Sequence, residues 1–146
     1  MISKKIVLDV SENQSEFELI GIISQIKSYR LVAEINYFFG IELMRDEDVL
    51  LNLGKNKQSY FLSYSAFPEQ EAVEIFLWAY KGTEGYLVEN LKKVDYFIQI
   101  KGDDRKDWAK KLYIALKNKY WYPNLIQLVN MMDTEQINKS KNNFLL

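Results

Sequence analysis

Two aspartates stand where a carboxylate could do chemistry. Asp9 and Asp95 each fall within a stretch of alternating apolar residues that predicts a β-strand. A carboxylate in a strand must be solvated, paired or hydrogen-bonded, and two that converge in a pocket could transfer a proton or hold a metal ion. The alternative is that each lies on a solvated face or at a strand end, where Lys5 or Lys101 pairs with it. We favour this structural interpretation, and the sequence leaves the convergence of the two strands open.

The rest of the catalytic repertoire is narrow, because the chain contains no His and no Cys. This composition excludes thiolate nucleophiles, Ser-His and Cys-His catalytic arrangements, disulfides and Cys/His zinc sites. The stretches Gly54–Lys57 and Gly82–Gly85 lack the spacing of phosphate-binding loops, and a turn explains both. We therefore expect no catalytic residue, no metal site and no cofactor. A binding function is favoured, and an enzyme or metal site built from carboxylates alone is the alternative.

Aromatic residues form a second group with functional potential. The stretch 72–81 predicts a strand with one aliphatic and one aromatic face. If helices cover only one side of the sheet, the aromatic side is open to a protein partner or to a second copy of the chain, and a homodimer is the simplest hypothesis. The predicted partner-binding residues are Phe61, Phe67, Phe76, Trp78 and Tyr80. The alternative is that loops, the C-terminal tail or a third layer cover these side chains.

A basic helix is the third candidate. The helix predicted over 105–120 carries lysines opposite its apolar arc, and further aromatic residues follow it. Such a surface could bind phosphates and stack bases of a nucleic acid. The residues that would make these contacts are Lys106, Lys110, Lys117 and Trp121. The net charge of the whole chain is −1, so we favour a solvated helix face and do not expect a nucleic-acid partner.

The elements that position these residues follow from the periodicity of apolar side chains. Strands are predicted at 4–10, 17–23, 49–53, 59–67, 72–81, 94–101 and 125–129, and helices at 29–39 and 105–120. The stretch 17–26 also fits a helix, but Gly21 and the β-branched residues favour a strand. Gly40 is expected to end the first helix, Asp104 to cap the second and Pro123 to stop it.

This order of elements, β-β-α-β-β-β-β-α-β, predicts the fold class. Strand runs interrupted by two helices are typical of an α+β domain with a mostly antiparallel sheet and both helices on one face. The unit over 94–129 could be a crossover of the ferredoxin-like kind. A length of 146 residues, with 48% hydrophobic and 27% charged residues, fits one globular domain over 1–146.

The sequence shows neither a typical signal peptide nor a typical membrane-spanning segment, and the cellular location is predicted from this. The N-terminal stretch has its apolar run interrupted by Asp9, which is not typical of a signal peptide. No run of 18 or more apolar residues occurs, so we expect no membrane association. A cytoplasmic protein is therefore expected, and the absence of Cys is compatible with a reducing compartment.

Several short motifs follow one another along the chain. They are Tyr29-Arg30-Leu31 with Ile35-Asn36, Val88-Glu89-Asn90 followed by Val94-Asp95-Tyr96, Ile100-Lys101-Gly102, and Ser140-Lys141-Asn142-Asn143-Phe144. In these motifs the chain resembles a family of small uncharacterised bacterial proteins named after the signature I-P-E-x-x-x-V-D-Y. Val88 replaces the first signature residue conservatively, whereas Glu89 and Asn90 depart from it. The resemblance implies no established activity, and Glu89 is the residue that could take any chemical role of the family's Glu.

Overall fold

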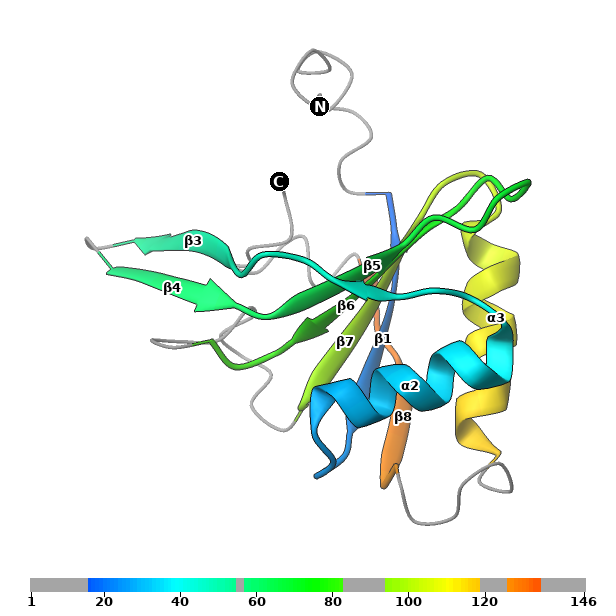
Figure 1. The fold of residues 1–146 in the computed structure, drawn as a ribbon, viewed down its shortest axis with the longest axis horizontal. Helices are drawn as coiled ribbons and strands as arrows, with labels where there is room; N and C mark the ends of the chain where they lie inside the picture. The colour runs from blue at the N-terminus through cyan, green and yellow to red at the C-terminus, as the bar shows by residue number, and fades with distance from the viewer. Residues whose placement is uncertain (1–15, 55–56, 83–93, 119–125, 135–146) are drawn as a thin grey trace.

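The computed structural model describes residues 16–54, 57–82, 94–118 and 126–134. These residues form two helices, a six-stranded antiparallel sheet and a two-stranded sheet, so the predicted α+β class is confirmed (Figure 1). The strand predicted at 4–10 lies outside the described residues. The strand predicted at 17–23 is confirmed in preference to a helix.

The elements follow the predicted order, with one strand added and one divided. They are β1 (Glu18–Ile23), α2 (Ser28–Phe39), β2 (Met44–Arg45), β3 (Val49–Gly54), β4 (Lys57–Phe61), β5 (Ser63–Ala66), β6 (Glu74–Ala79), β7 (Tyr96–Lys101), α3 (Arg105–Lys117) and β8 (Leu128–Met131). The single strand predicted over 59–67 breaks at Leu62. Its first part pairs with β3 in a hairpin, and its second part joins the main sheet.

The main sheet has the strand order β2-β5-β6-β7-β1-β8. Both β7 and β8 are antiparallel to β1, which lies between them, so they run parallel to each other. The helix α3 connects these two strands. The unit β7-α3-β8 is therefore a split β-α-β arrangement, as expected for a ferredoxin-like C-terminal half.

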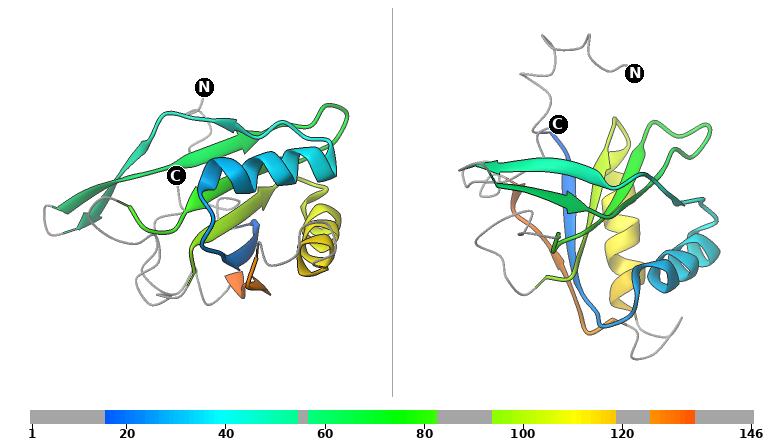
Figure 2. Two further views of the ribbon diagram at one scale, coloured as in Figure 1. Left: turned by 60° about the horizontal axis from the view of Figure 1, so that its bottom comes forward. Right: turned by 60° about the vertical axis from the view of Figure 1, so that its left-hand side comes forward.

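The two helices pack on the same face of the sheet (Figures 1 and 2). The buried side of α2 consists of Leu31, Val32 and Ile35, and that of α3 of Trp108, Ala109, Leu112 and Leu116. They meet the aliphatic face of the central strands, where Ile20, Ile22, Leu77, Ile98 and Ile100 are buried. Full burial of one such aliphatic side chain contributes about 1.5–3 kcal/mol. This layer is the main core because it contains most of the buried hydrophobic residues.

A second core lies on the opposite face of the sheet and corrects the prediction of an open aromatic surface. Leu51 and Phe61 of the β3–β4 hairpin pack in one cluster with Phe17, Leu19, Trp78, Tyr80 and Phe97. Phe61, Trp78 and Tyr80 are therefore buried, because the chain turns off the main sheet at Leu62 and forms a covering hairpin. The indole Nε1 of Trp78 donates a hydrogen bond to Gln99 Oε1 at 3.0 Å within this core. Phe76 is half-buried, and Phe67 is 60% exposed.

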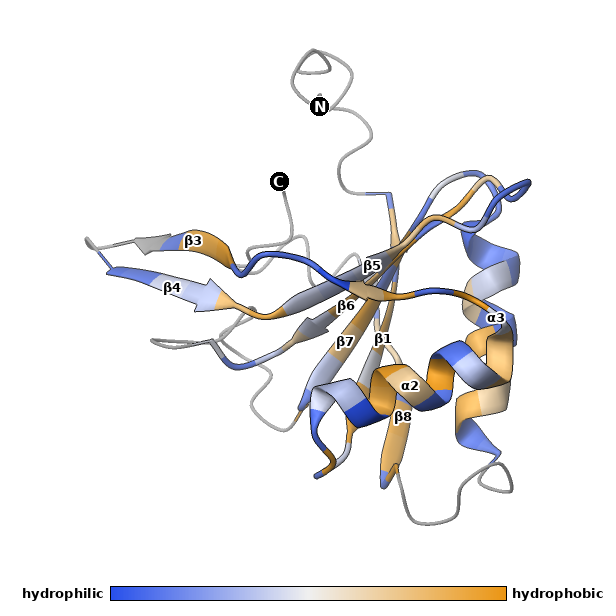
Figure 3. Cartoon of the chain, viewed as in Figure 1, coloured by the Kyte–Doolittle hydropathy of each residue, from blue (hydrophilic) through white to orange (hydrophobic). Residues whose placement is uncertain are grey.

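Hydrophilic residues gather in two connections between strands, at the tip of the turn between β5 and β6 and in the segment between β2 and β3 (Figure 3). The first connection spans residues 67–73, and the second spans residues 46–48. Both adjoin the strand pair β2–β5, which forms one edge of the main sheet. These connections therefore shape the surface at that edge.

Candidate functional site

The predicted carboxylate pair is not brought together by the described structure. Asp9 lies outside the described residues. Asp95 is exposed at the start of β7, where its Oδ2 accepts a hydrogen bond from the Ser24 N–H at 2.9 Å and its own N–H donates to the Ile22 carbonyl at 2.8 Å. Within the described ranges, no three acidic residues are grouped so that they could hold a metal ion. Asp95 thus secures the end of β1.

The residues around Asp95 also secure the connection between β1 and α2. The Tyr96 hydroxyl donates a hydrogen bond to the Ile26 carbonyl at 2.6 Å. Burial raises the pKa of Tyr96, and the negative charge of Asp95 and the nearby Tyr64 raise it further. A Cβ added at Gly21 would lie 3.4 Å from a methyl group of Val94, so that side chain packs against β1. The Val94-Asp95-Tyr96 motif therefore connects the start of β7 to β1 and to the loop between β1 and α2.

Two other motif residues, Asn36 and Gly102, lie where an element meets a neighbouring loop. The Asn36 side chain on α2 donates to the Leu43 carbonyl at 3.1 Å and accepts from the Leu43 N–H at 2.8 Å. Gly102 has a φ of 113°, and a Cβ there would lie only 2.3 Å from the Ala72 carbonyl oxygen. Asp104 precedes α3 as predicted, but its carboxylate accepts the Ala72 N–H at 3.0 Å in place of a helix N–H. The motif residues thus position loops.

The basic surface of α3 is solvated. Lys106, Lys110 and Lys117 are exposed, and Trp121 lies outside the described residues. The Lys111 ammonium lies 4.2 Å from the centroid of the Trp108 ring, and Lys117 lies 5.2 Å from that of Tyr113. Lysines therefore cover these two rings, which leaves them poorly placed for stacking on bases.

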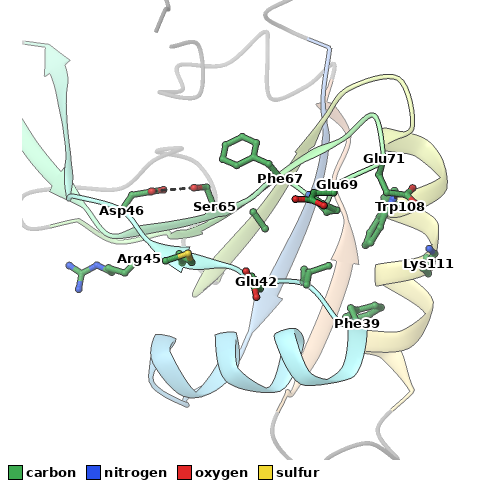
Figure 4. A pocket seen from close by; sticks show the side chains of 15 residues that line it. Phe39, Glu42, Arg45, Asp46, Ser65, Phe67, Glu69, Glu71, Trp108 and Lys111 are labelled. Atoms are coloured by element: carbon green, nitrogen blue, oxygen red, sulfur yellow. Dashed lines mark hydrogen bonds between the residues drawn. The ribbon is translucent and has the colours of Figure 1, made fainter.

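A groove of about 960 Å³ lies where the end of α2, the strand pair β2–β5 and the first turns of α3 meet (Figure 4). We call it the α2–α3 groove. Its apolar lining consists mainly of Phe39, Ile41, Met44, Phe67, Pro68 and Trp108. Met44 is 66% exposed and Phe67 is 60% exposed, whereas Trp108 is 6% exposed. The groove thus has an apolar lining that is only partly covered.

Charged side chains complete the lining of the α2–α3 groove. They are Glu42, Arg45, Asp46, Glu69, Glu71 and Lys111. The Trp108 Nε1 donates to Glu71 Oε1 at 3.1 Å, and the Ser65 hydroxyl donates to Asp46 Oδ1 at 3.1 Å (Figure 4). These two hydrogen bonds fix the turn after β5 against α3 and the end of β2 against β5. The walls of the groove are therefore tied together.

A second hollow of about 510 Å³ adjoins the groove. It shares Phe67, Pro68 and Glu71 with the α2–α3 groove and adds Glu74 and Asp103. We call it the side hollow. Because the two depressions share these three residues, they flank the same turn between β5 and β6. An extended chain crossing this turn would contact both.

Of the residues that line this site, only Phe67 was among the predicted partner-binding residues. Phe67 was predicted to bind a partner, and it lines both depressions. A signal for the rest was present in the charge pattern: the segments 42–48 and 69–74 together contain seven of the 20 acidic residues of the chain and one basic residue, Arg45. These two segments show no helical or strand period, because both lie largely in connections between elements.

Comparison with protein-family models, with curated proteins and with solved structures finds no match to this chain. Neither helix in the described ranges is long and apolar enough to span a membrane.

Proposed function

We propose that this chain is a small binding domain that holds a segment of a partner polypeptide in the α2–α3 groove. The observation that carries the proposal is the pair of exposed apolar side chains, Met44 and Phe67, which line the same depression as the buried Trp108. Large apolar side chains grouped in a concave surface are typical of the centre of a protein interface. Covering each of these two residues would contribute about 1–2 kcal/mol to binding, because each is more than half exposed.

The lining supports binding in preference to catalysis. The chain supplies no imidazole or thiol, and two of the carboxylates that line the groove, Asp46 and Glu71, accept hydrogen bonds from Ser65 and Trp108. Those two carboxylates hold the walls of the groove. An apolar centre bordered by charged side chains is the usual anatomy of an interface between proteins.

A polypeptide segment suits this groove better than a small molecule does. Small-molecule sites enclose most of the ligand surface, whereas this depression lies along an open edge of the sheet and continues into the side hollow. An extended segment advances about 3.3 Å per residue, so several successive side chains could contact the two depressions.

The test is selection of peptides from a random display library on the purified chain. Affinities of the selected peptides are then measured by fluorescence anisotropy for the wild type, for the double variant Met44→Ser/Phe67→Ser and for the control Tyr37→Ser/Ile114→Ser. The control removes two exposed large side chains that lie outside the groove. We expect the groove variant to weaken binding at least about tenfold and the control to leave it unchanged. Equal binding by the groove variant, or a library that yields no binding peptide, would refute the proposal.

We also propose that the chain belongs to the bacterial family that it resembles and that it works in the cytoplasm. The positions of Asn36, Val94, Asp95, Tyr96 and Gly102 support the first proposal, because these motif residues fasten the loops of the scaffold. The absence of Cys from the sequence is compatible with a reducing compartment and supports the second.

A further inference from the structure

We infer that the partner segment is basic, with apolar side chains that cover Met44 and Phe67 and with Lys or Arg residues around them. This inference rests on the proposed function and names the chemistry of its partner. It is argued from the apolar groove itself and from the charges that border it.

Carboxylates outnumber cations along the lining of the α2–α3 groove. Glu42, Asp46, Glu69 and Glu71 line it, against Arg45 and Lys111. The whole chain is nearly neutral, with a net charge of −1, so the negative charge is concentrated at this site. A depression lined by one sign of charge attracts ligands of the opposite sign.

Both cations of the groove already have partners. The Arg45 Nη2 lies 2.6 Å from Asp48 Oδ1, and the Lys111 ammonium lies over the Trp108 ring. The other ion pairs of the described part of the chain join Arg105 to Glu16 and Glu18.

Two carboxylates of the groove make no ion pair with any residue that the structure describes. Glu42 and Glu69 are exposed and have no ionic partner among residues 16–54, 57–82, 94–118 and 126–134. They come from two separate segments that both line the groove, the connection after α2 and the turn after β5. Cationic side chains of a bound segment would pair with them.

The side hollow, which Phe67 also lines, contains further carboxylates. Its lining adds the carboxylates of Glu74 and Asp103 and contains no Lys or Arg among the described residues. Lys101 lies opposite Glu74 on the neighbouring strand and offsets the charge of that carboxylate, and its Nζ lies 5.3 Å from the centroid of the half-buried Phe76 ring. Asp103 in the side hollow and Glu42 and Glu69 in the α2–α3 groove therefore place negative charge in both depressions that Phe67 lines. This arrangement matches a partner whose apolar residues have basic ones around them.

Other occupants fit the charges less well. A nucleic acid or an acidic segment would be repelled by these carboxylates. A second copy of the chain is the stronger rival, because the exposed lysines of α3, Lys106, Lys110 and Lys117, could enter the groove of a neighbour. Sedimentation velocity distinguishes this rival: a concentration-dependent dimer that disappears when these three lysines are changed to Gln would overturn the assignment to a separate partner.

The experiment uses four fluorescein-labelled peptides of about 12 residues, which span roughly 40 Å when extended. Three share one set of Leu and Trp residues and carry Lys, Ser or Glu at the remaining positions, and the fourth keeps the Lys residues but replaces every apolar residue with Ser. We expect the Lys peptide to bind the wild-type chain most tightly and the Glu peptide most weakly. Raising the salt concentration from about 0.1 to 1 M, which shortens the Debye length from about 10 to 3 Å, should remove the advantage of Lys over Ser.

Matched variants assign the effect to the groove. Glu42→Gln/Glu69→Gln should reduce affinity for the Lys peptide about three- to tenfold and leave affinity for the Ser peptide unchanged. The control Glu16→Gln/Glu34→Gln removes the same charge from positions outside the groove and should change neither affinity. Equal binding of the Lys and Ser peptides would overturn the inference but leave the proposed function standing. Loss of binding to all four peptides and to the library would refute both.

Discussion

Replacing Asn36 with Ala tests how the segment that lines the α2–α3 groove is held in place. The Asn36 side chain makes two hydrogen bonds to the backbone of Leu43, at 2.8 and 3.1 Å. Leu43 is only 4% exposed. Ala at position 36 offers no donor or acceptor, so the N–H and the carbonyl of Leu43 lose their partners together.

The magnitude follows from these two contacts. Each hydrogen bond contributes about 0.5–1.5 kcal/mol net, which gives about 2 kcal/mol for both. Ala favours a helix over Asn by up to about 0.7 kcal/mol, which offsets part of the loss. We therefore expect Asn36→Ala to lower the free energy of unfolding by about 1.5 kcal/mol.

The assay is equilibrium unfolding in urea, followed by Trp fluorescence. With a slope of about 1–3 kcal/mol per molar urea, the midpoint should fall by roughly 0.5–1.5 M. The control is Tyr37→Ala, at the next position of the same helix. Tyr37 is 89% exposed, so we expect a change within about 0.5 kcal/mol. If the two variants unfold at the same urea concentration, the Asn36 side chain does not stabilise the connection after α2.

Two further predictions concern the scaffold around the groove. Gly40→Ala should cost about 1 kcal/mol through its φ of 67° alone, whereas Gly102→Ala should cost about 2–4 kcal/mol, because its Cβ would also lie 2.3 Å from the Ala72 carbonyl oxygen. Equal losses in the urea assay would contradict this contrast. Tyr96→Phe should cost about 0.5–1.5 kcal/mol at neutral pH through loss of the hydrogen bond to Ile26. Because burial raises the pKa of Tyr96 above its ordinary value of 10.0, the folded wild type keeps a proton that the unfolded chain releases, and its stability falls as pH rises above 10.0. The difference between wild type and variant should therefore shrink on alkaline titration, and a constant difference would count against the burial of this hydroxyl.

Local patterns were sufficient to predict most of the secondary structure. Leu31, Val32 and Ile35 recur at helical spacing, and α2 buries these three residues. The alternation in 94–101 predicted the strand that became β7. Such patterns work because the periods of helices and strands differ, so one buried face is enough to reveal the element. The two-residue strand β2 escaped this reasoning, since two residues are too few to show a period.

The β3–β4 hairpin covers the aromatic face of β6, and this contact joins segments that are distant in the sequence. The alternation of Phe76, Trp78 and Tyr80 predicted that they share a face, but their exposure depends on what lies over them. The break at Leu62 turns the chain into a hairpin, and Leu51 and Phe61 pack into the same cluster. No local signal in the stretch 59–67 indicates that its two halves pair with different strands.

Residue type and local spacing account for the class of fold, for the absence of imidazole and thiol chemistry, and for the concentration of carboxylates in two short segments. The packing of separate elements brings Phe39, Phe67 and Trp108 into one groove, together with carboxylates from both acidic segments. The physical reason is that a groove is formed by the packing of separate elements. Its shape depends on strand order and on the hydrogen bonds that fasten the loops, and neither has a period that can be recognised along the chain.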